Sequence, residues 1–337
     1  MANSAFNPNA GYGRALLDSV ASQVPAFGDV HVVLSASDTA HNNYQVTQEV
    51  FQSANGFVRF WNTVLEAYTA CQSNNNDVIA LDAATTHSVA TMLTWSKSRI
   101  HVIGFDGGGR RTQQGAKIQL SGAVDAAAVF KVTGVRNSFR NIKFIQSSTH
   151  ANALNVVQFA GEGNYYEDCS FIFGVADNLD LTTSSEALMG EDAGTFVRCS
   201  FGTDVLLTSG ARAVMTLDAI SGASSADGAK SNRFIDCESV IMSSSASALH
   251  VKLADTAGAK FLNKWVNFDM SSVISSGGGG IATTNAIASA AGFVDGSLVF
   301  VRPTTSGCTN GCATVTDQVV VTAAVASNNA WEGLAPA

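Results

Sequence analysis

A six-residue motif recurs along the chain and decides the fold: FRNIKF at 139–144, YEDCSF at 166–171, FVRCSF at 196–201 and FIDCES at 234–239. Each copy begins with an aromatic residue, and Ile or Cys stands fourth. The motif and the residues up to its next copy form a repeat unit of roughly thirty residues. One such unit cannot bury its own apolar face, so the units are expected to stack on one another. The repeat therefore predicts a solenoid.

Weaker copies of the motif lie at 100–104 and 262–267. A second apolar run precedes the stronger copies, as at 156–159, and a turn cluster such as 160–164 separates the run from the motif. Each unit therefore holds two or three short strands divided by Gly, Asn, Asp and Ser turns. We expect an all-β chain that winds into a parallel β-helix.

Stacked coils place equivalent residues about 4.8 Å apart, so the motif predicts interior columns. One column holds the aromatic residues Phe139, Tyr166, Phe196 and Phe234. The other holds the central residues Val102, Ile142, Cys169, Cys199, Cys237 and Trp265. A metal or redox site is the functional interpretation of the cysteines. Because free cysteine is usually buried and no CxxC or nearby His accompanies them, we interpret them as core side chains.

The segments at the two ends differ from the repeats. An apolar series with helical spacing precedes the first coil: Phe57, Phe60, Trp61, Val64, Leu65, Tyr68 and Cys71. Thr63 and Glu66 form a capping box, which predicts a capping helix over 63–72. Residues 1–55 are interpreted as an N-terminal arm that anchors the protein, with a strand at 30–34. The β-helix is expected over 56–270, and a last coil with a small β-rich C-terminal tail over 271–337.

Composition excludes several classes of protein. The chain has 19 basic and 27 acidic residues and a net charge of −8, which argues against nucleic-acid binding because phosphate contacts need clustered Lys and Arg. A hydrophobic share of 46% excludes a disordered chain. No apolar stretch approaches about 18 residues, so we expect no membrane span. The first residues lack the basic and apolar regions of a signal peptide.

Motifs that bind metals or phosphates are weak. Cys308 and Cys312 flank an Asn-Gly pair that favours a tight turn, and the two cysteines could form a disulfide, supply half of a metal site or stay as free thiols. Residues 107–111 (GGGRR) lack the Lys-Ser/Thr of a phosphate-binding loop. The histidines show no paired spacing and are interpreted as surface or turn residues: His31, His41, His87, His101, His150 and His250. We predict no metal site and no cofactor.

Carboxylates matter because β-helices often host polysaccharide-cleaving sites, which need two carboxylates around the scissile bond. The candidates are Asp177, Asp180, Glu191, Asp192 and Asp204. They form no compact cluster with a matched base in the sequence. Asp168 and Asp236 share one position of the repeat with Arg198 between them, which indicates an outward ladder of acid, base and acid. We assign no catalytic residue.

Three segments resemble the coils of pectate-lyase-like, right-handed parallel β-helix proteins: DVIAL at 77–81, LTWSKSRIHVIG at 93–104 and NYYEDCSF at 164–171. The resemblance covers about residues 57–270 and implies that fold. The Asp-Asp, Gly-His-Gly and Arg-x-Lys motifs of the polygalacturonase branch do not occur in this sequence. No catalytic residue is therefore carried over from the family.

The whole chain also resembles β-helix proteins encoded among bacteriophage structural genes, through its capping helix and the GLA sequence at 333–335. This resemblance implies a non-enzymatic virion protein, a homotrimer that decorates the capsid as a head spike and contacts the major capsid protein or another virion protein. Such a protein is assembled in the host cytoplasm. The alternative is a tailspike-type polysaccharide lyase or glycoside hydrolase. A third possibility is a non-catalytic module that binds a host-surface glycan.

Overall fold

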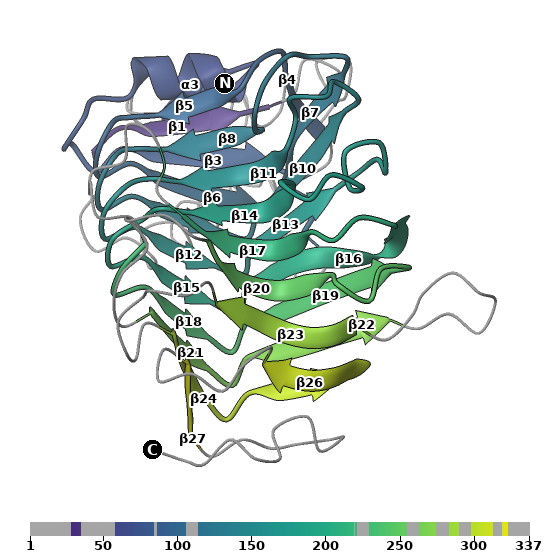
Figure 1. Ribbon diagram of the computed structural model, residues 1–337. Helices are drawn as coiled ribbons and strands as arrows, with labels where there is room; N and C mark the ends of the chain where they lie inside the picture. The colour runs from purple at the N-terminus through teal and green to yellow at the C-terminus, as the bar shows by residue number, and fades with distance from the viewer. Residues whose placement is uncertain are drawn as a thin grey trace, which may run out of the picture.

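The chain folds as a right-handed parallel β-helix, built from three all-parallel sheets that run side by side along the solenoid (Figure 1). The computed structural model describes residues 28–34, 58–83, 86–105, 114–218, 220, 229–254, 263–273, 283–289, 298–312 and 319–322. Successive coils each add one strand to each sheet, as the repeat predicts, so the expected fold class is confirmed.

Sheet A is the longest, with 11 strands in the order β2-β1-β3-β6-β9-β12-β15-β18-β21-β24-β27. Its strands are β1 Val30–Val33, β2 Val58–Trp61, β3 Val78–Asp82, β6 His101–Phe105, β9 Ser138–Arg140, β12 Tyr165–Glu167, β15 Thr195–Val197, β18 Arg233–Ile235, β21 Asn263–Val266, β24 Leu298–Val301 and β27 Val319–Thr322. Sheet B contains β4 Thr86–Val89, β7 Lys117–Gly122, β10 Lys143–Ser148, β13 Ser170–Phe173, β16 Ser200–Thr208, β19 Glu238–Ser243, β22 Asp269–Val273 and β25 Thr304–Ser306. Sheet C contains β5 Leu93–Trp95, β8 Phe130–Val132, β11 Asn155–Phe159, β14 Ser185–Met189, β17 Ala213–Leu217, β20 Leu249–Leu253, β23 Thr283–Ser289 and β26 Cys308–Cys312.

The aromatic column forms inside sheet A. The rings of Phe139, Tyr166, Phe196 and Phe234 stack with centroids 5.3, 4.5 and 4.7 Å apart and nearly parallel planes. Trp265 and Phe300 continue the same stack at 4.9 and 4.6 Å. Offset stacking of this kind adds stability beyond the area that each ring buries. The column therefore ties one coil to the next through the centre of the molecule.

The register of two weaker copies differs from the prediction. Val102 pairs with Phe139, and Trp265 pairs with Phe234, so both belong to the aromatic column and not to the cysteine column. In the coil of Trp265, the residue three positions later, Phe268, takes the place that Cys237 has in its own coil and is fully buried. The prediction failed because a Val or a Trp fits either column, and only the backbone pairing distinguishes the two.

The cysteine column is part of the core. Cys169, Cys199 and Cys237 are free and buried. Their thiols donate to backbone carbonyls of the preceding coil, at 3.4 Å for Cys169 to Phe139 and 3.5 Å for Cys199 to Tyr166. Burial, above all, raises the pKa of Cys199 well above its usual range. Neutral thiols hydrogen-bonded to the backbone are structural, as the spacing predicts.

A sharp bend separates six strands of sheet A (β9, β12, β15, β18, β21 and β24) from the sheet B strand that follows each of them. The bend residue has a left-handed backbone with φ of 51–56° in successive coils: Asn141, Asp168, Arg198, Asp236, Asn267 and Arg302. The amides of the first five donate to the neighbouring coil, as from Asp168 to the Val197 carbonyl at 3.0 Å. Left-handed backbone is unusual for residues with a Cβ, so these inter-coil bonds hold it in place.

A helix covers the N-terminal end of the solenoid (Figure 1). Helix α3 spans Val64–Ala70, and Thr63 and Glu66 form the predicted capping box. Val64, Ala67 and Tyr68 face the core. Of the predicted 1–55 arm, the described residues 30–33 form β1, which lies between β2 and β3 inside sheet A. No helix in the described ranges is long and apolar enough to span a membrane.

The coils continue through the region predicted as a C-terminal tail. Strands β22 and β25 extend sheet B, β23 and β26 extend sheet C, and β24 and β27 extend sheet A. Residues 313–318 and 323–337 lie outside the described part of the chain. The described portion of 271–337 is thus built from further coils of the same β-helix.

Candidate functional sites

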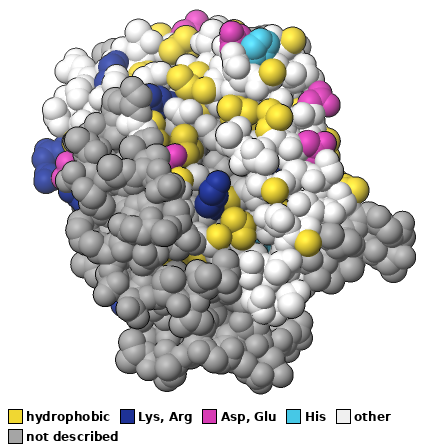
Figure 2. Space-filling model, viewed as in Figure 1, with side chains coloured by type: hydrophobic (Ala, Val, Ile, Leu, Met, Phe, Trp, Pro, Cys, Tyr) yellow, Lys and Arg dark blue, Asp and Glu magenta, His cyan; other side chains and the backbone are white. Residues whose placement is uncertain are grey.

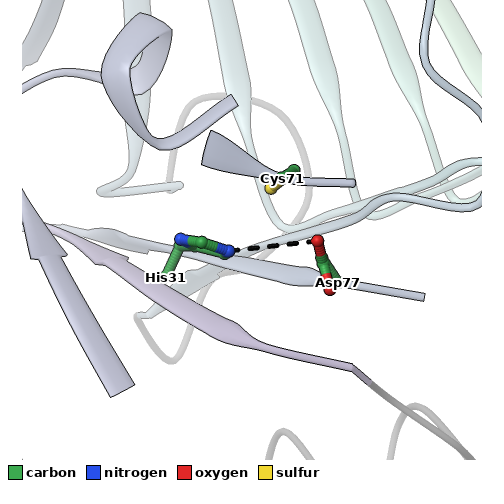
Figure 3. Close-up of side chains that lie close together, drawn as sticks. All are labelled: His31, Cys71 and Asp77. Carbon is green, nitrogen blue, oxygen red and sulfur yellow. Dashed lines mark ion pairs between the residues drawn. The ribbon is translucent and has the colours of Figure 1, made fainter. Parts of the chain in front are cut away.

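Three side chains that resemble a set of metal ligands meet beneath the capping helix (Figure 3). His31 comes from β1, Cys71 from the end of α3 and Asp77 from the residue before β3. All are buried, and their candidate ligand atoms lie within 4.8 Å of one another. The sequence did not indicate this cluster, because its members are far apart in the chain and follow no metal-binding spacing.

Hydrogen bonding in this cluster opposes metal binding. Trp61 donates its indole Nε1–H to His31 Nδ1 at 2.9 Å. An indole nitrogen can only donate, so Nδ1 carries the lone pair and the proton of the neutral imidazole lies on Nε2. Nε2 is the atom that faces Asp77 Oδ2, at 4.0 Å. Burial, with a smaller contribution from Asp77, raises the pKa of Cys71 to about 12, so a metal ion would have to displace the thiol proton.

Asp77 instead joins three segments of the chain. Its Oδ1 accepts from the Asp29 amide at 2.9 Å and from Asn75 Nδ2 at 2.6 Å. Its Oδ2 accepts from the Gln72 amide at 2.6 Å. Charge-assisted bonds of this kind are roughly twice as strong as neutral ones. The cluster therefore fits an anchor that fastens β1 and the end of α3 to the first coil.

The other histidines divide between core and surface. The interpretation as surface or turn residues is wrong for His31, His87 and His250, which are buried in strands. His250 contacts Ser239 Oγ through Nδ1 at 2.8 Å and Ser272 Oγ through Nε2 at 3.0 Å. Burial and the charge of Arg212 lower the pKa of His250 to about 3, so it stays neutral. His41 and the glycine-rich segment 107–111 lie outside the described residues.

The prediction of a tight turn between Cys308 and Cys312 is wrong. Residues 308–312 form strand β26, which pairs with β23 through Thr283 and Cys308. Cys308 is a free, buried thiol that accepts from Thr283 Oγ1 at 3.2 Å. The stacking of one more coil on sheet C outweighs the local turn preference of Asn-Gly.

The candidate carboxylates are distributed over different environments. Asp177, Asp180 and Asp204 are exposed, and Asp180 accepts from the Ser209 amide at 2.6 Å. Asp192 forms an ion pair with Lys230 at 3.2 Å. Glu191 is fully buried. Among the described residues on the face drawn in Figure 2, white and yellow atoms outnumber the charged side chains. A carboxylate that faces the core cannot flank the same substrate bond as a carboxylate that faces solvent. Glu191 therefore cannot form a catalytic pair with Asp177, Asp180 or Asp204.

Glu191 belongs to a row of buried asparagine side chains, each of which lies just before or at the start of a sheet A strand. The Asn137 amide donates to Asn164 Oδ1 at 2.8 Å, and the Asn232 amide donates to Asn263 Oδ1 at 3.2 Å. In the coil between them the equivalent position is Gly194, which has no side chain. Glu191 Oε1 fills this place and accepts from Asn164, at 3.2 Å from its amide and 2.6 Å from its Nδ2.

Burial raises the pKa of Glu191 to about 7, although the bonds from Asn164 and the proximity of the Tyr166 hydroxyl oppose the rise. Its other oxygen, Oε2, is buried without a well-formed hydrogen bond in the described structure, and so is the Tyr166 hydroxyl. The carboxyl faces the asparagine row and not solvent. Its chemistry is therefore that of a buried proton-binding group within the core.

Carboxylates and arginines also gather where β9 and β12 meet the bend on the outer side of sheet A. Arg198 donates to both Asp168 oxygens at 2.8 Å and also to Glu167. Arg140 approaches Glu167 at 3.3 Å and lies over the Tyr165 ring. The hydrogen bonds that Arg198 donates to Asp168 raise the pKa of Arg198. Of the predicted ladder, Asp236 instead accepts from Asn267, at 2.7 Å.

A buried ion pair in the interior was not evident from the sequence. Arg212 donates to both oxygens of Glu186 at 2.7 Å, and the two side chains are 1% and 0% exposed. One signal for this pair is present in the sequence: Glu186 and Arg212, of opposite charge, lie at the apolar runs of two consecutive coils. Sequence reasoning overlooked it because charged residues are rarely buried unless they are paired.

The fold is shared with pectin methylesterases. No protein-family model matches the sequence, and no curated protein matches it either. Two structures of the pectin methylesterase from Aspergillus niger are 12% identical and align with TM-scores of 0.54 and 0.55, over 89% of this chain and 86% and 85% of theirs. A pectin methylesterase variant in complex with a hexasaccharide is 11% identical, with a TM-score of 0.50 over 90% of both chains. At these identities the likeness concerns the fold alone.

Proposed function

We propose that this chain is a non-enzymatic structural protein of a bacteriophage virion, a trimeric β-helix that decorates the capsid. The observation that supports this role best is the aromatic column from Phe139 to Phe300, whose neighbouring rings are 4.5–5.3 Å apart. A solenoid filled in this way resists compression and bending, because protein interiors are densely packed. A rigid rod is what an element needs to hold loops away from a shell.

The N-terminal end suits attachment. Strand β1 lies between β2 and β3, with parallel register from Val30 to Val33 on both sides. Asp77 additionally fixes the residue before β1 through the Asp29 amide. A pull on the arm that precedes β1 is therefore distributed over several backbone hydrogen bonds at once. In this proposal the 1–55 region binds the major capsid protein or another virion protein.

Mass spectrometry of purified virions tests the proposal. We expect the chain in particles at a copy number that is a multiple of three, and its absence from particles would reject the function. A chain truncated before Gly28 should fold, which circular dichroism checks, and should no longer bind to particles that lack it. The full-length chain, added to the same particles, serves as the control.

A polysaccharide-active enzyme or a glycan-binding module remains the second candidate. It is favoured by the outer group of Arg140, Tyr165, Glu167, Asp168 and Arg198, because rings, carboxylates and guanidinium groups are the side chains that bind sugars. However, Glu167 and Asp168 already contact arginine side chains, so a sugar would have to displace those contacts. Digestion of host polysaccharide and a glycan array separate the two possibilities. If cleavage occurs, Asp168→Asn should abolish it, whereas Asp177→Asn and Asp180→Asn should leave it unchanged.

A further inference from the structure

Sheet B departs from its regular register at β16. Thr203 pairs with Ile241 and Leu207 pairs with the adjacent Met242, so the intervening residues form a bulge. Val205, within this bulge, is 72% exposed. Figure 1 shows the end of β16 projecting at the edge of the solenoid. Bulges that redirect side chains are conserved design features of sheets and are common at functional surfaces.

Exposed apolar side chains concentrate at this corner. The large hydrophobic residues exposed in the described structure are Leu65, Leu181, Val205 and Leu207. Leu181 belongs to the loop that contacts the end of β16, since Thr208 Oγ1 donates to the Leu179 carbonyl at 2.7 Å. We define the corner patch as Leu181, Val205 and Leu207 with the exposed carboxylates Asp177, Asp180 and Asp204. Clustered apolar surface with a polar rim is typical of interaction sites.

On the outer face of sheet A, strands β18 and β21 carry the opposite charge. Ile235, Val266 and Val301 are register partners in β18, β21 and β24 and are half-buried. Beside them stand the exposed cations Arg233, Lys264 and Arg302. We define these residues as the basic strip. Arg233 and Lys264 are direct neighbours in the ladder, and like charges at such positions are destabilising unless an acidic partner compensates them.

We propose that the corner patch of one copy docks on the basic strip of a second copy. Both surfaces combine apolar side chains with charged ones. The corner patch carries three carboxylates, and the basic strip carries three cations against one half-buried carboxylate, Asp236, which accepts from Asn267. Such a contact uses different surfaces on the two copies, so repetition closes into a ring where the rotation permits. The inference rests on the trimer of the proposed function and identifies the residues that would hold it. Charge complementarity of this kind sets partner choice and register.

Sedimentation velocity and light scattering of the full chain test the contact. We expect the wild type to form a trimer that weakens at high salt, because the rims are exposed. The basic-strip variant Arg233→Glu/Lys264→Glu and the acidic-rim variant Asp180→Lys/Asp204→Lys should each associate more weakly by about tenfold or more. Arg136→Glu reverses an exposed cation outside the strip and should leave the trimer intact.

The variant that combines all four substitutions is the decisive test. Because both rims are reversed together, the trimer should return towards wild-type affinity. A monomeric wild type, a trimer indifferent to either reversal, or a combined variant that stays dissociated would each overturn the proposal. Val205→Ser, which changes no charge, should also weaken association, and circular dichroism checks that every variant folds. Absence of the chain from virions would reject the proposed function but would leave this contact standing.

Discussion

Replacing Glu191 by Gln should stabilise the protein, and the gain should depend on pH. The carboxyl is fully buried, and its pKa rises from 4.5 to about 7 because burial disfavours the ionised form. At about 1.4 kcal/mol per pKa unit, this rise corresponds to about 3 kcal/mol. Gln keeps the carbonyl oxygen that accepts from Asn164, and its amide can replace Oε2 beside Tyr166.

The sign follows from proton linkage. The folded protein holds the Glu191 proton more tightly than the unfolded chain does. Its stabilising contribution is therefore fully present below a pH of about 4.5 and is lost as the pH rises to about 7. The neighbouring titratable groups are Tyr166 and Asp192, and the charge of Asp192 raises the Glu191 pKa further. Glu191→Gln should match the wild type in acid and exceed it in mildly alkaline buffer by up to about 3 kcal/mol.

Urea unfolding followed by tryptophan fluorescence at several pH values measures this difference. The midpoint of the variant should separate from that of the wild type between about pH 5 and 8. Asp177→Asn removes an exposed carboxylate and should show no such divergence. A difference between wild type and Glu191→Gln that stays constant with pH would refute the reasoning, since it would mean that the buried carboxyl titrates normally.

Three further changes test the interior. Phe196→Ala removes one ring from the aromatic column and should lower the free energy of unfolding by about 3–5 kcal/mol in urea titrations, so a loss no larger than that of a surface variant would contradict the column's role. Glu186→Gln leaves Arg212 buried without its ionic partner and should lower the free energy of unfolding by about 3–5 kcal/mol. The double variant Glu186→Leu/Arg212→Met should recover most of this loss. If Glu186→Gln melted at the same temperature as the wild type, a buried ion pair would be contradicted. Neither zinc nor a chelator should change the melting temperature of the wild type, because His31 Nδ1 already accepts from Trp61. If zinc raised the melting temperature of the wild type but not that of Cys71→Ser, the cluster of His31, Cys71 and Asp77 would be a metal site.

The spacing of the repeated motif predicts much of the fold, but it does not predict the candidate sites. The repeat at Phe139, Tyr166, Phe196 and Phe234 predicts stacking because each coil must bury the same face. The polar clusters join residues that no local pattern relates: Asp77 meets His31 from an earlier strand, and Glu191 fills a place left by Gly194. Such contacts depend on which coil lies next to which, so they appear only when the coils are stacked.

The sequence by itself determined the solenoid, the capping helix and the buried cysteines, because periodic apolar residues, a capping box and a recurring small side chain are local signals. The tertiary structure alone decided the register of Val102 and Trp265, the strand at 308–312 and the burial of Glu191 and Arg212. The physical reason is that burial and pairing are properties of neighbouring coils. A chain of low charge can still enclose ionisable groups wherever the adjacent coil supplies their partners.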